Sequence, residues 1–373
     1  MVIHNRNALL TGILLLIQFA ALWSIDESGL RPYRLIHADS LKANKINGAY
    51  ISELIGAVHF FYGNTEFFTD QAFLYEQEKV VRMTGNVRVI EDSLNLEAER
   101  VNYFRLQEKL DLEENVEFHE SHQDNSWRTF EAERVEYLRE NKNFEAWENV
   151  RVYDSRENVS GKCGYMTYNV DKGFGYLREN PELQMSKSDD ILIKSQKIEY
   201  YDDYKKIVAI FEVSTIMPDY NLTSDFLIYY SEEEKATYRG EPRLYSEQFD
   251  AEAAEVTLFF RENKLHYAQM NDSCRVVYKV NEEGVKENWV TSEEMEFEFL
   301  NGVVHECIAR RGVESYFVQQ ANKLKRQDYL SNEATAEKLI MYMNTEGYIE
   351  QIGLSKAITG KYRFEGNENN SKQ

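Results

Sequence analysis

The most regular feature of the hydrophobic pattern is a tyrosine that returns about every thirty residues. The intervals between successive members are 29 to 34 residues for Tyr103, Tyr137, Tyr168, Tyr200 and Tyr229. Each has an apolar residue two positions earlier, and apolar and polar residues alternate on both sides of it. Such alternation is typical of half-buried strands. A repeat of this period predicts a stacked array of one supersecondary unit.

The alternation changes phase once in each unit. Apolar positions end at Ala98 and resume at Val101, three residues later, across Glu99-Arg100. In a strand, a one-residue phase change turns every later side chain to the other face. The chain can keep one face inward only through a bulge or a corner. Glu99 and its equivalents are therefore predicted to be corners between two strands that share one apolar interior.

A second position, seventeen residues after the corner, is almost as regular. It carries Val87, Val116, Val150, Pro181, Val213 and Pro242. Glycine stands two residues earlier at Gly85 and Gly240, as expected where a strand folds back sharply. Gly173-Phe174-Gly175 is predicted to form a tight turn.

These units predict an all-β fold, a long V-shaped β-jellyroll of about ten tandem two-pass units of roughly 31 residues. The units begin at Asp39, Asp70, Glu99, Glu133, Gly164, Gln196, Asp225, Ala254, Glu293 and Glu337. Residues 35–245 are the regular array, 246–364 a looser continuation of it, and 365–373 a disordered polar tail.

The inward stripe of this array is rich in Phe, Tyr and Met. It is either a dry packed core or an apolar groove, and the pattern alone leaves both open. The residues predicted to line a groove are Leu94, Leu96, Val101, Tyr103, Leu112, Val116, Phe118, Val135, Tyr137, Val150, Met166, Tyr168, Ile198, Tyr200, Val213, Leu227 and Tyr229.

The N-terminus predicts export. Arg6 precedes the uncharged run Ala8–Trp23, which small residues and then acids follow. Residues 1–24 are typical of a secretory signal peptide. An uncleaved anchor in the inner membrane is the alternative, although the run is short for a bilayer span of about 20 residues. A periplasmic location is predicted in both cases.

Charge and motifs argue against nucleic acid and against an enzyme. The net charge is −21, so nothing neutralises phosphates along a nucleic acid. Acids that recur at the corners serve architecture, the histidines share no position in the unit, and no catalytic motif is present. No cofactor and no metal site are expected. A disulfide is left open for the pair Cys274 and Cys307.

In tandem, these motifs resemble the OstA-like family of lipopolysaccharide-transport proteins, of the LptA type. The matching segments are His37-Ala38-Asp39-Ser40-Leu41, Phe68-Thr69-Asp70-Gln71-Ala72, Gly85-Asn86-Val87-Arg88-Val89, Leu96-Glu97-Ala98-Glu99-Arg100-Val101 and Phe130-Glu131-Ala132-Glu133-Arg134-Val135. The resemblance implies a V-shaped jellyroll whose apolar interior holds lipid acyl chains. It also implies end-to-end pairing, through edge strands, with other jellyroll transport proteins. The expected function is then to carry lipopolysaccharide or a related glycolipid between the inner and outer membranes.

Two other classes of function compete with this one. A structural or adhesive β-solenoid would act as a protein-interaction scaffold and would have a dry core. A polysaccharide-active repeat enzyme would need a carboxylate pair outside the repeat, and the sequence shows none.

Overall fold

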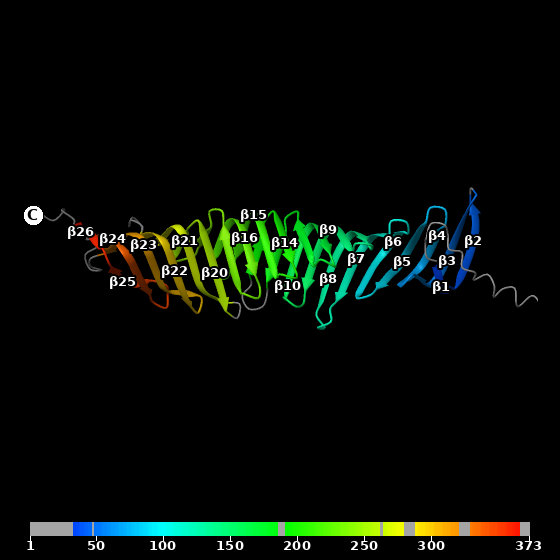
Figure 1. The fold of residues 1–373 in the computed structure, drawn as a ribbon, viewed down its shortest axis with the longest axis horizontal. Helices are drawn as coiled ribbons and strands as arrows, with labels where there is room; N and C mark the ends of the chain where they lie inside the picture. Colours follow the sequence, from blue (N-terminus) through cyan, green and yellow to red (C-terminus); the bar gives the residue numbers. More distant parts are fainter. Residues whose placement is uncertain are drawn as a thin grey trace, which may run out of the picture. The chain divides into compact units, whose positions relative to one another are not determined.

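The computed structural model describes residues 33–46, 48–185, 191–261, 264–279, 288–320 and 329–365. Every helix or strand in these ranges is a β-strand (Figure 1). This confirms the predicted all-β, jellyroll-like array of tandem strands, while the number of units stays a prediction. The segment predicted as signal peptide or anchor and all but the first residue of the predicted tail lie outside the described residues. No helix in the described part of the chain is long and apolar enough to span a membrane.

The chain divides into two compact units. Unit 1 comprises Met1–Glu120 and Arg134–Glu140, and unit 2 comprises Ser121–Glu133 and Asn141–Gln373. The division falls within β8 (Trp127–Leu138), whose first part belongs to unit 2 and whose second part belongs to unit 1. This division differs from the expected change from regular to looser repeats at residue 245, which stays a prediction.

The remaining strands follow one another along the chain. Those of unit 1 are β1 (Tyr33–His37), β2 (Ser40–Ile46), β3 (Ala49–Tyr62), β4 (Thr65–Tyr75), β5 (Val80–Glu91), β6 (Leu94–Phe104) and β7 (Lys109–Ser121), which ends at the unit boundary. Those of unit 2 are β9 (Asn143–Asp154), β10 (Val159–Asn169), β11 (Phe174–Arg178), β12 (Glu182–Met185), β13 (Ile191–Lys194), β14 (Lys197–Tyr201), β15 (Lys206–Ile216), β16 (Asn221–Tyr230), β17 (Lys235–Arg239), β18 (Arg243–Tyr245), β19 (Phe249–Glu252), β20 (Glu255–Arg261), β21 (Lys264–Tyr278), β22 (Asn288–Leu300), β23 (Val303–Gln320), β24 (Tyr329–Met343), β25 (Ile349–Ser355) and β26 (Thr359–Glu365).

Within each unit, successive strands pair antiparallel and the pairing is interrupted at the predicted corners. Between β5 and β6, for example, the register shifts between Thr84 and Val87, opposite Glu99. The extra residues form a bulge, and both carry a positive φ. Adjacent positive-φ pairs recur at 56–57, 85–86, 114–115, 148–149, 179–180, 211–212, 240–241, 272–273, 311–312 and 356–357. Each bulge keeps one face of the strand inward, as the phase change predicted.

A backbone hydrogen bond ties many corners to the bulge of the following strand. The N–H of Asp225, the first residue of its unit, donates to the carbonyl of Gly240 at 3.0 Å, and the N–H of Gln196 donates to Phe211 at 3.0 Å. The side chains at the corners explain why glycine stands in some of the bulges. A Cβ atom on Gly85, at φ +81°, would lie 2.5 Å from the Asp70 carboxylate. A corner aspartate therefore requires glycine in the next bulge.

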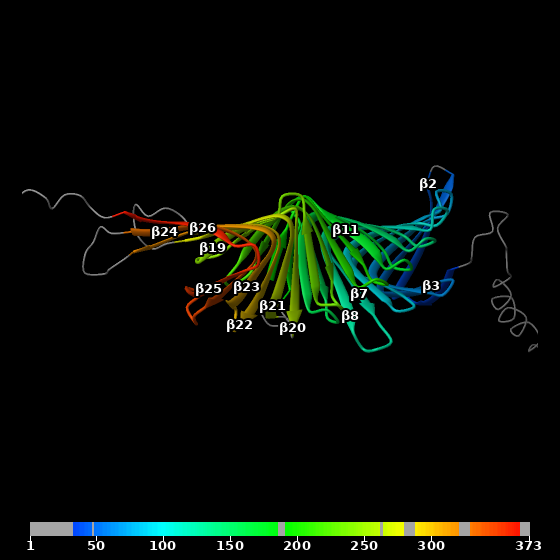
Figure 2. The ribbon, with the colours of Figure 1, turned by 60° about the vertical axis from the view of Figure 1, so that its left-hand side comes forward.

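Because each long strand bends at its bulge, each unit has two facing layers, which Figure 2 shows for the strands of unit 2. We name the layers walls 1 and 2. In unit 2, wall 1 contains 127–131, 150–154, 159–163, 182–185, 191–194 and 213–216, and wall 2 contains 165–169, 174–178, 197–201, 206–210, 226–230, 235–239 and 255–261. In unit 1, wall 1 contains 58–62, 65–69, 87–91 and 94–98, and wall 2 contains 71–75, 80–84, 100–104 and 109–113.

The facing walls of unit 1 enclose a packed core. Phe67 of wall 1 stacks on Phe60 with ring centroids 4.9 Å apart, and it meets Tyr103 of wall 2 at 5.5 Å. Tyr62 contacts the same tyrosine at 5.4 Å. Leu96, Leu110, Leu112 and Phe118 are also buried. The tyrosines of the repeat thus face inward, as predicted.

All three cysteines are free thiols and buried. The bridge left open for Cys274 and Cys307 is therefore not formed. Burial raises the pKa of each thiol to about 12.

Candidate functional site

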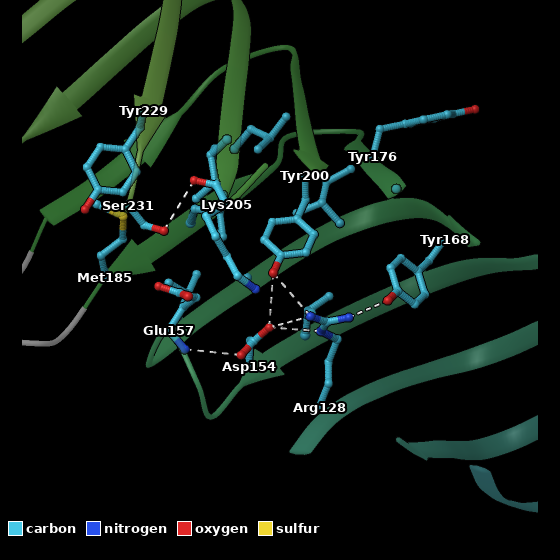
Figure 3. Close-up of a pocket in the computed structure, with 18 of the residues that line it drawn as sticks. Arg128, Asp154, Glu157, Tyr168, Tyr176, Met185, Tyr200, Lys205, Tyr229 and Ser231 are labelled. Carbon is cyan, nitrogen blue, oxygen red and sulfur yellow. Dashed lines mark hydrogen bonds and ion pairs between the residues drawn. The ribbon is translucent and has the colours of Figure 1, made fainter. Parts of the chain in front are cut away.

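Unit 2 contains a cavity of about 200 Å³ between its walls (Figure 3). Most of its surface is apolar and comes from both walls. Wall 1 supplies Phe130, Val152, Val159, Leu183, Met185 and Ile191, and wall 2 supplies Met166, Leu177, Ile198, Ile207 and Phe260. An apolar cavity of about 150 Å³ accepts a molecule of the size of benzene. This cavity therefore has room for a short stretch of an apolar chain.

Two glycines line the cavity, one in each wall, and only Gly161 leaves room for a side chain. A Cβ atom on Gly175 would lie 2.5 Å from the Thr167 carbonyl oxygen and 3.0 Å from the Tyr168 ring. Gly161 of wall 1 lies opposite Val152 and Leu183 in the sheet, and Gly175 of wall 2 lies opposite Tyr168. At the position that corresponds to Gly175, unit 1 has Leu110 opposite Tyr103. Gly175 was predicted to lie in a turn. That prediction was wrong, because the turn ends at Gly173 and β11 begins at Phe174.

A buried polar cluster, which we name the rim clasp, joins the two walls at one end of the cavity. It consists of Arg128 and Asp154 from wall 1 and Tyr168 and Tyr200 from wall 2 (Figure 3). The Arg128 guanidinium donates to Asp154 Oδ2 at 2.6 and 3.0 Å and to the Tyr200 hydroxyl at 3.2 Å. It also donates to the Tyr168 hydroxyl. Both tyrosine rings lie 5.2 Å from the guanidinium carbon, within cation–π range.

Burial and charge shift the pKa of Asp154 in the clasp in opposite directions. Burial tends to raise the pKa of Asp154, but the Arg128 guanidinium and two backbone N–H groups hold it below its ordinary value. Those N–H groups, from Arg156 and Glu157, donate to Asp154 Oδ1 at 2.9 and 3.2 Å. Burial raises the pKa of Tyr200 well above its usual range. The clasp thus contains an ionised carboxylate, a guanidinium and neutral phenols at neutral pH.

Polar groups from two turns surround the cavity beyond the clasp. Lys205 donates to Asp202 Oδ1 at 2.7 Å, and the Ser231 hydroxyl donates to the Lys205 carbonyl at 3.3 Å (Figure 3). Burial, with a further contribution from the Glu234 and Glu157 carboxylates, raises the pKa of Tyr229 to about 12. The site is therefore amphipathic, with an apolar interior and a charged, hydrogen-bonding border.

Unit 1 has a clasp of the same kind but with a different arrangement. Arg139 donates to Glu91 of wall 1 at 2.9 Å and to the Tyr103 hydroxyl at 2.7 Å. It also pairs with Glu108 at 2.5 Å and donates to Thr65. In both units an arginine thus bridges an acid at the end of wall 1 to a tyrosine of the repeat.

The structure separates the predicted groove residues into three groups. Those that line the cavity are Met166, Tyr168, Ile198, Tyr200 and Tyr229. Those buried in unit 1 are Leu94, Leu96, Val101, Tyr103, Leu112, Val116, Phe118, Val135 and Tyr137. Those buried in unit 2 outside the cavity are Val150, Val213 and Leu227.

Sequence reasoning missed several residues of the site. Leu183, Met185 and Ile191 continue the apolar alternation after Pro181, so a signal for them was present in the pattern. Arg128 and Asp154 stand at strand ends, at the positions that Leu94 and Glu120 have in the unit of Glu99. Nothing in the pattern indicates that they meet each other and Tyr200, which is 72 residues from Arg128 and 46 from Asp154.

The chain was compared with protein families, with curated proteins and with solved structures. Residues 68–206 match the family model described as LptA/(LptD N-terminal domain) LPS transport protein. No curated protein matches the chain. Among solved structures, the chain is similar to LptH from Pseudomonas aeruginosa, the LptA homologous periplasmic component of the lipopolysaccharide transport device of that organism. The identity is 20%, over 32% of this chain and 83% of LptH, with a TM-score of 0.28 that supports no structural argument.

The family match spans the region in which four of the five tandem motifs and most of the cavity residues lie. It thereby confirms, over residues 68–206, the predicted resemblance to the OstA-like, LptA-type family of lipopolysaccharide-transport proteins.

Proposed function

We propose that this chain is a periplasmic, non-enzymatic carrier that holds the acyl part of lipopolysaccharide or a related glycolipid between the walls of unit 2. One observation carries the proposal: an apolar cavity with a charged border lies between the walls, largely within the segment that matches the transport family. The chain would then work in the passage of glycolipid between the inner and outer membranes.

The energetics of the cavity suit an acyl chain. Each methylene group removed from water contributes about 0.8 kcal/mol, and the lining consists largely of aliphatic and aromatic carbon. Sugars and phosphates would gain nothing there, so they would remain at the border beside Lys205 and Ser231. A cavity of about 200 Å³ takes only a short part of a long acyl chain. Binding of a longer part of the acyl chain requires the walls to move apart.

The partners would be other jellyroll transport proteins that pair through edge strands. The terminal strands of the array expose apolar side chains. Leu41 and Ile46 on β2 are 58% and 52% exposed, and Tyr362 on β26 is 71% exposed. An unpaired strand edge readily accepts another strand.

The test is chemical crosslinking from inside the cavity. A photo-reactive amino acid at Met166 or Tyr229 should capture a glycolipid in living cells, whereas one at the outward, exposed Lys162 should not. Mass spectrometry of organic extracts of the purified protein identifies the lipid. Extracts without lipid, together with no capture from either cavity position, would refute the proposal.

A dry scaffold is the second candidate function, and the core of unit 1 favours it. Stacked Phe60 and Phe67, with Tyr103, fill the space between those walls. If the interior of unit 2 is equally dry in the cell, the protein would bind other proteins through its edges and carry no lipid. The same extraction distinguishes the two candidates, because only the carrier retains glycolipid.

A further inference from the structure

The outer face of wall 2 in unit 2 carries a row of aromatic and lysine side chains, one from each of six neighbouring strands. Direct pairing of neighbouring strands places its members side by side, and they are Phe174, Tyr201, Lys206, Tyr230, Lys235 and Phe259. We name this set the outer aromatic row. Its residues alternate with inward residues such as Tyr200 and Ile207, so the row faces away from the cavity.

Five of the six members of the row contact a neighbour in it. Phe174 and Tyr201 have ring centroids 4.9 Å apart. The Lys206 ammonium lies 4.0 Å from the centre of the Tyr201 ring, and that of Lys235 lies 5.8 Å from the centre of the Phe259 ring. Phe259 continues to Tyr267 of β21 at 5.5 Å. The result is a row of ring faces with two ammonium groups set between them.

The two lysines of the row differ from most basic residues near them. Within the described ranges, neither Lys206 nor Lys235 forms an ion pair. The nearby Glu199 carboxylate pairs instead with Lys197 at 2.6 Å. On a chain of net charge −21, two ammonium groups held on rings and outside ion pairs form a local site for an anion. The Glu199 carboxylate borders this site, because its pKa is lowered in part by Lys206 and it accepts from the Tyr201 hydroxyl at 2.7 Å. The rings give that site a second property, because an electron-rich aromatic face attracts the C–H face of a sugar ring.

The row also lies beside the border of the cavity. Tyr201 and Lys206 flank the turn that carries Lys205, and Tyr230 and Lys235 flank the turn that carries Ser231. Both turns contribute to the cavity lining. The row therefore begins directly beside two turns that line the cavity.

We propose that the outer aromatic row binds an anionic oligosaccharide. The sugar rings would stack on Tyr201, Tyr230 and Phe259, and the phosphate or carboxylate groups would meet Lys206 and Lys235. This oligosaccharide is the sugar part of the amphiphile whose acyl part enters the cavity, and only this last step rests on the function proposed above. Wall 2 then separates the two parts of one molecule, with the acyl chain on its inner face and the sugar on its outer face.

The experiment uses the full chain and a probe without acyl groups. The probe is the phosphorylated oligosaccharide that hydrolysis releases from lipopolysaccharide, and its binding is measured by calorimetric titration. Dextran is the neutral sugar control, and polyglutamate is the anionic control without sugar. We expect the phosphorylated oligosaccharide to bind more tightly than either control.

Substitutions separate the two properties of the row. Lys206→Gln with Lys235→Gln should weaken binding of the phosphorylated probe about five- to tenfold and leave dextran binding unchanged. Lys206→Arg with Lys235→Arg should keep it. Tyr201→Ala with Phe259→Ala should weaken both sugars about tenfold. The matched control, Lys162→Gln with Lys194→Gln, removes the same charge from the outer face of wall 1 and should change nothing.

Three outcomes decide the proposal, once thermal unfolding shows that each variant is folded. The expected pattern of losses supports it. Absence of oligosaccharide binding overturns it, even where the protein still yields lipid on extraction, and the carrier function then survives alone. Equal binding of polyglutamate, with the same sensitivity to the variants, overturns it in favour of an unspecific anion surface. Oligosaccharide binding by a protein that never yields lipid supports the row and contradicts the carrier function.

Discussion

Two substitutions at Gly161 test the cavity: alanine should stabilise the fold, and leucine should weaken lipid binding. A Cβ atom at this position would meet Leu177 and Leu183 carbons at 3.4 Å, which is ordinary contact. Gly161→Ala therefore fits without displacement of the walls. It removes the backbone entropy that glycine loses on folding and buries one methyl group, which together contribute about 1 kcal/mol to stability.

Gly161→Leu extends the same change into the space that a lipid would occupy. Its side chain displaces about three methylene groups of any acyl chain, which weakens binding by about 2 kcal/mol, or about thirtyfold. Stability is read from urea unfolding of the lipid-free protein, and binding from the amount of glycolipid that the purified protein retains. Gly353, an exposed strand glycine of β25 with open surroundings, is the matched control position, and Gly353→Leu should leave retention unchanged.

Retention of lipid by Gly161→Leu at the level of the unmodified protein would refute the reasoning, because the space it fills would then not be the binding site. A loss of stability in Gly161→Ala would refute the geometry, because the walls would then lie closer together than the 3.4 Å contacts allow.

Other features of the structure lead to measurable expectations. Arg128→Met should speed hydrogen exchange at the adjoining strand ends about 100-fold. It leaves the buried Asp154 carboxylate without its main partner, which costs about 3 kcal/mol of stability. A second substitution, Asp154→Asn, keeps the turn and should restore most of the protection. Since the pKa of Asp154 lies below its ordinary 3.8, the stability from the clasp is complete above that pH and is lost as the pH falls through the lowered value, which hydrogen exchange measured at descending pH detects. Gly85→Ala should destabilise by more than about 1 kcal/mol in urea unfolding, because φ is +81° and the new Cβ meets a carboxylate, whereas Gly312→Ala, with open space at φ +61°, should cost less. A thiol reagent at pH 8 should label no cysteine in the native protein and all three in denaturant; native labelling would contradict the burial and raised pKa of Cys163, Cys274 and Cys307.

The corners were predictable because they follow from geometry that every unit shares. A period of two, broken once by a step of three, requires a bulge or a corner if one face is to stay inward, and the structure has a bulge in β5 opposite the corner Glu99. Inward placement of the tyrosines follows from the same rule. These predictions needed no knowledge of which strands face each other across the interior.

The clasps and the cavity were not predictable in this way, because they depend on contacts between the walls. Arg139 reaches Glu91 over 48 residues of sequence, and Arg128 reaches Tyr200 over 72. Arg139 stands two residues after Tyr137, as Arg105 does after Tyr103, and Arg128 takes the place that Leu94 has before Glu99. A charged residue at a strand end nevertheless usually indicates nothing more than a solvated turn. Their burial becomes visible only when the separation of the walls is known.

Whether such an array is dry or hollow is decided at single inward positions and not by the fold. Unit 1 and unit 2 share corners, bulges and inward tyrosines. Within wall 2, however, Tyr103 is paired with Leu110 in unit 1, while Tyr168 is paired with Gly175 in unit 2. The missing side chain at Gly161 leaves space that the regular backbone cannot close, because its strand spacing is set by hydrogen bonds and not by side-chain size, whereas the Tyr168 ring already covers Gly175. A chain of this kind can therefore alternate packed and open sections along one continuous repeat. The periodic apolar stripe shows where the interior lies, and the small residues within the stripe show where a ligand can enter it.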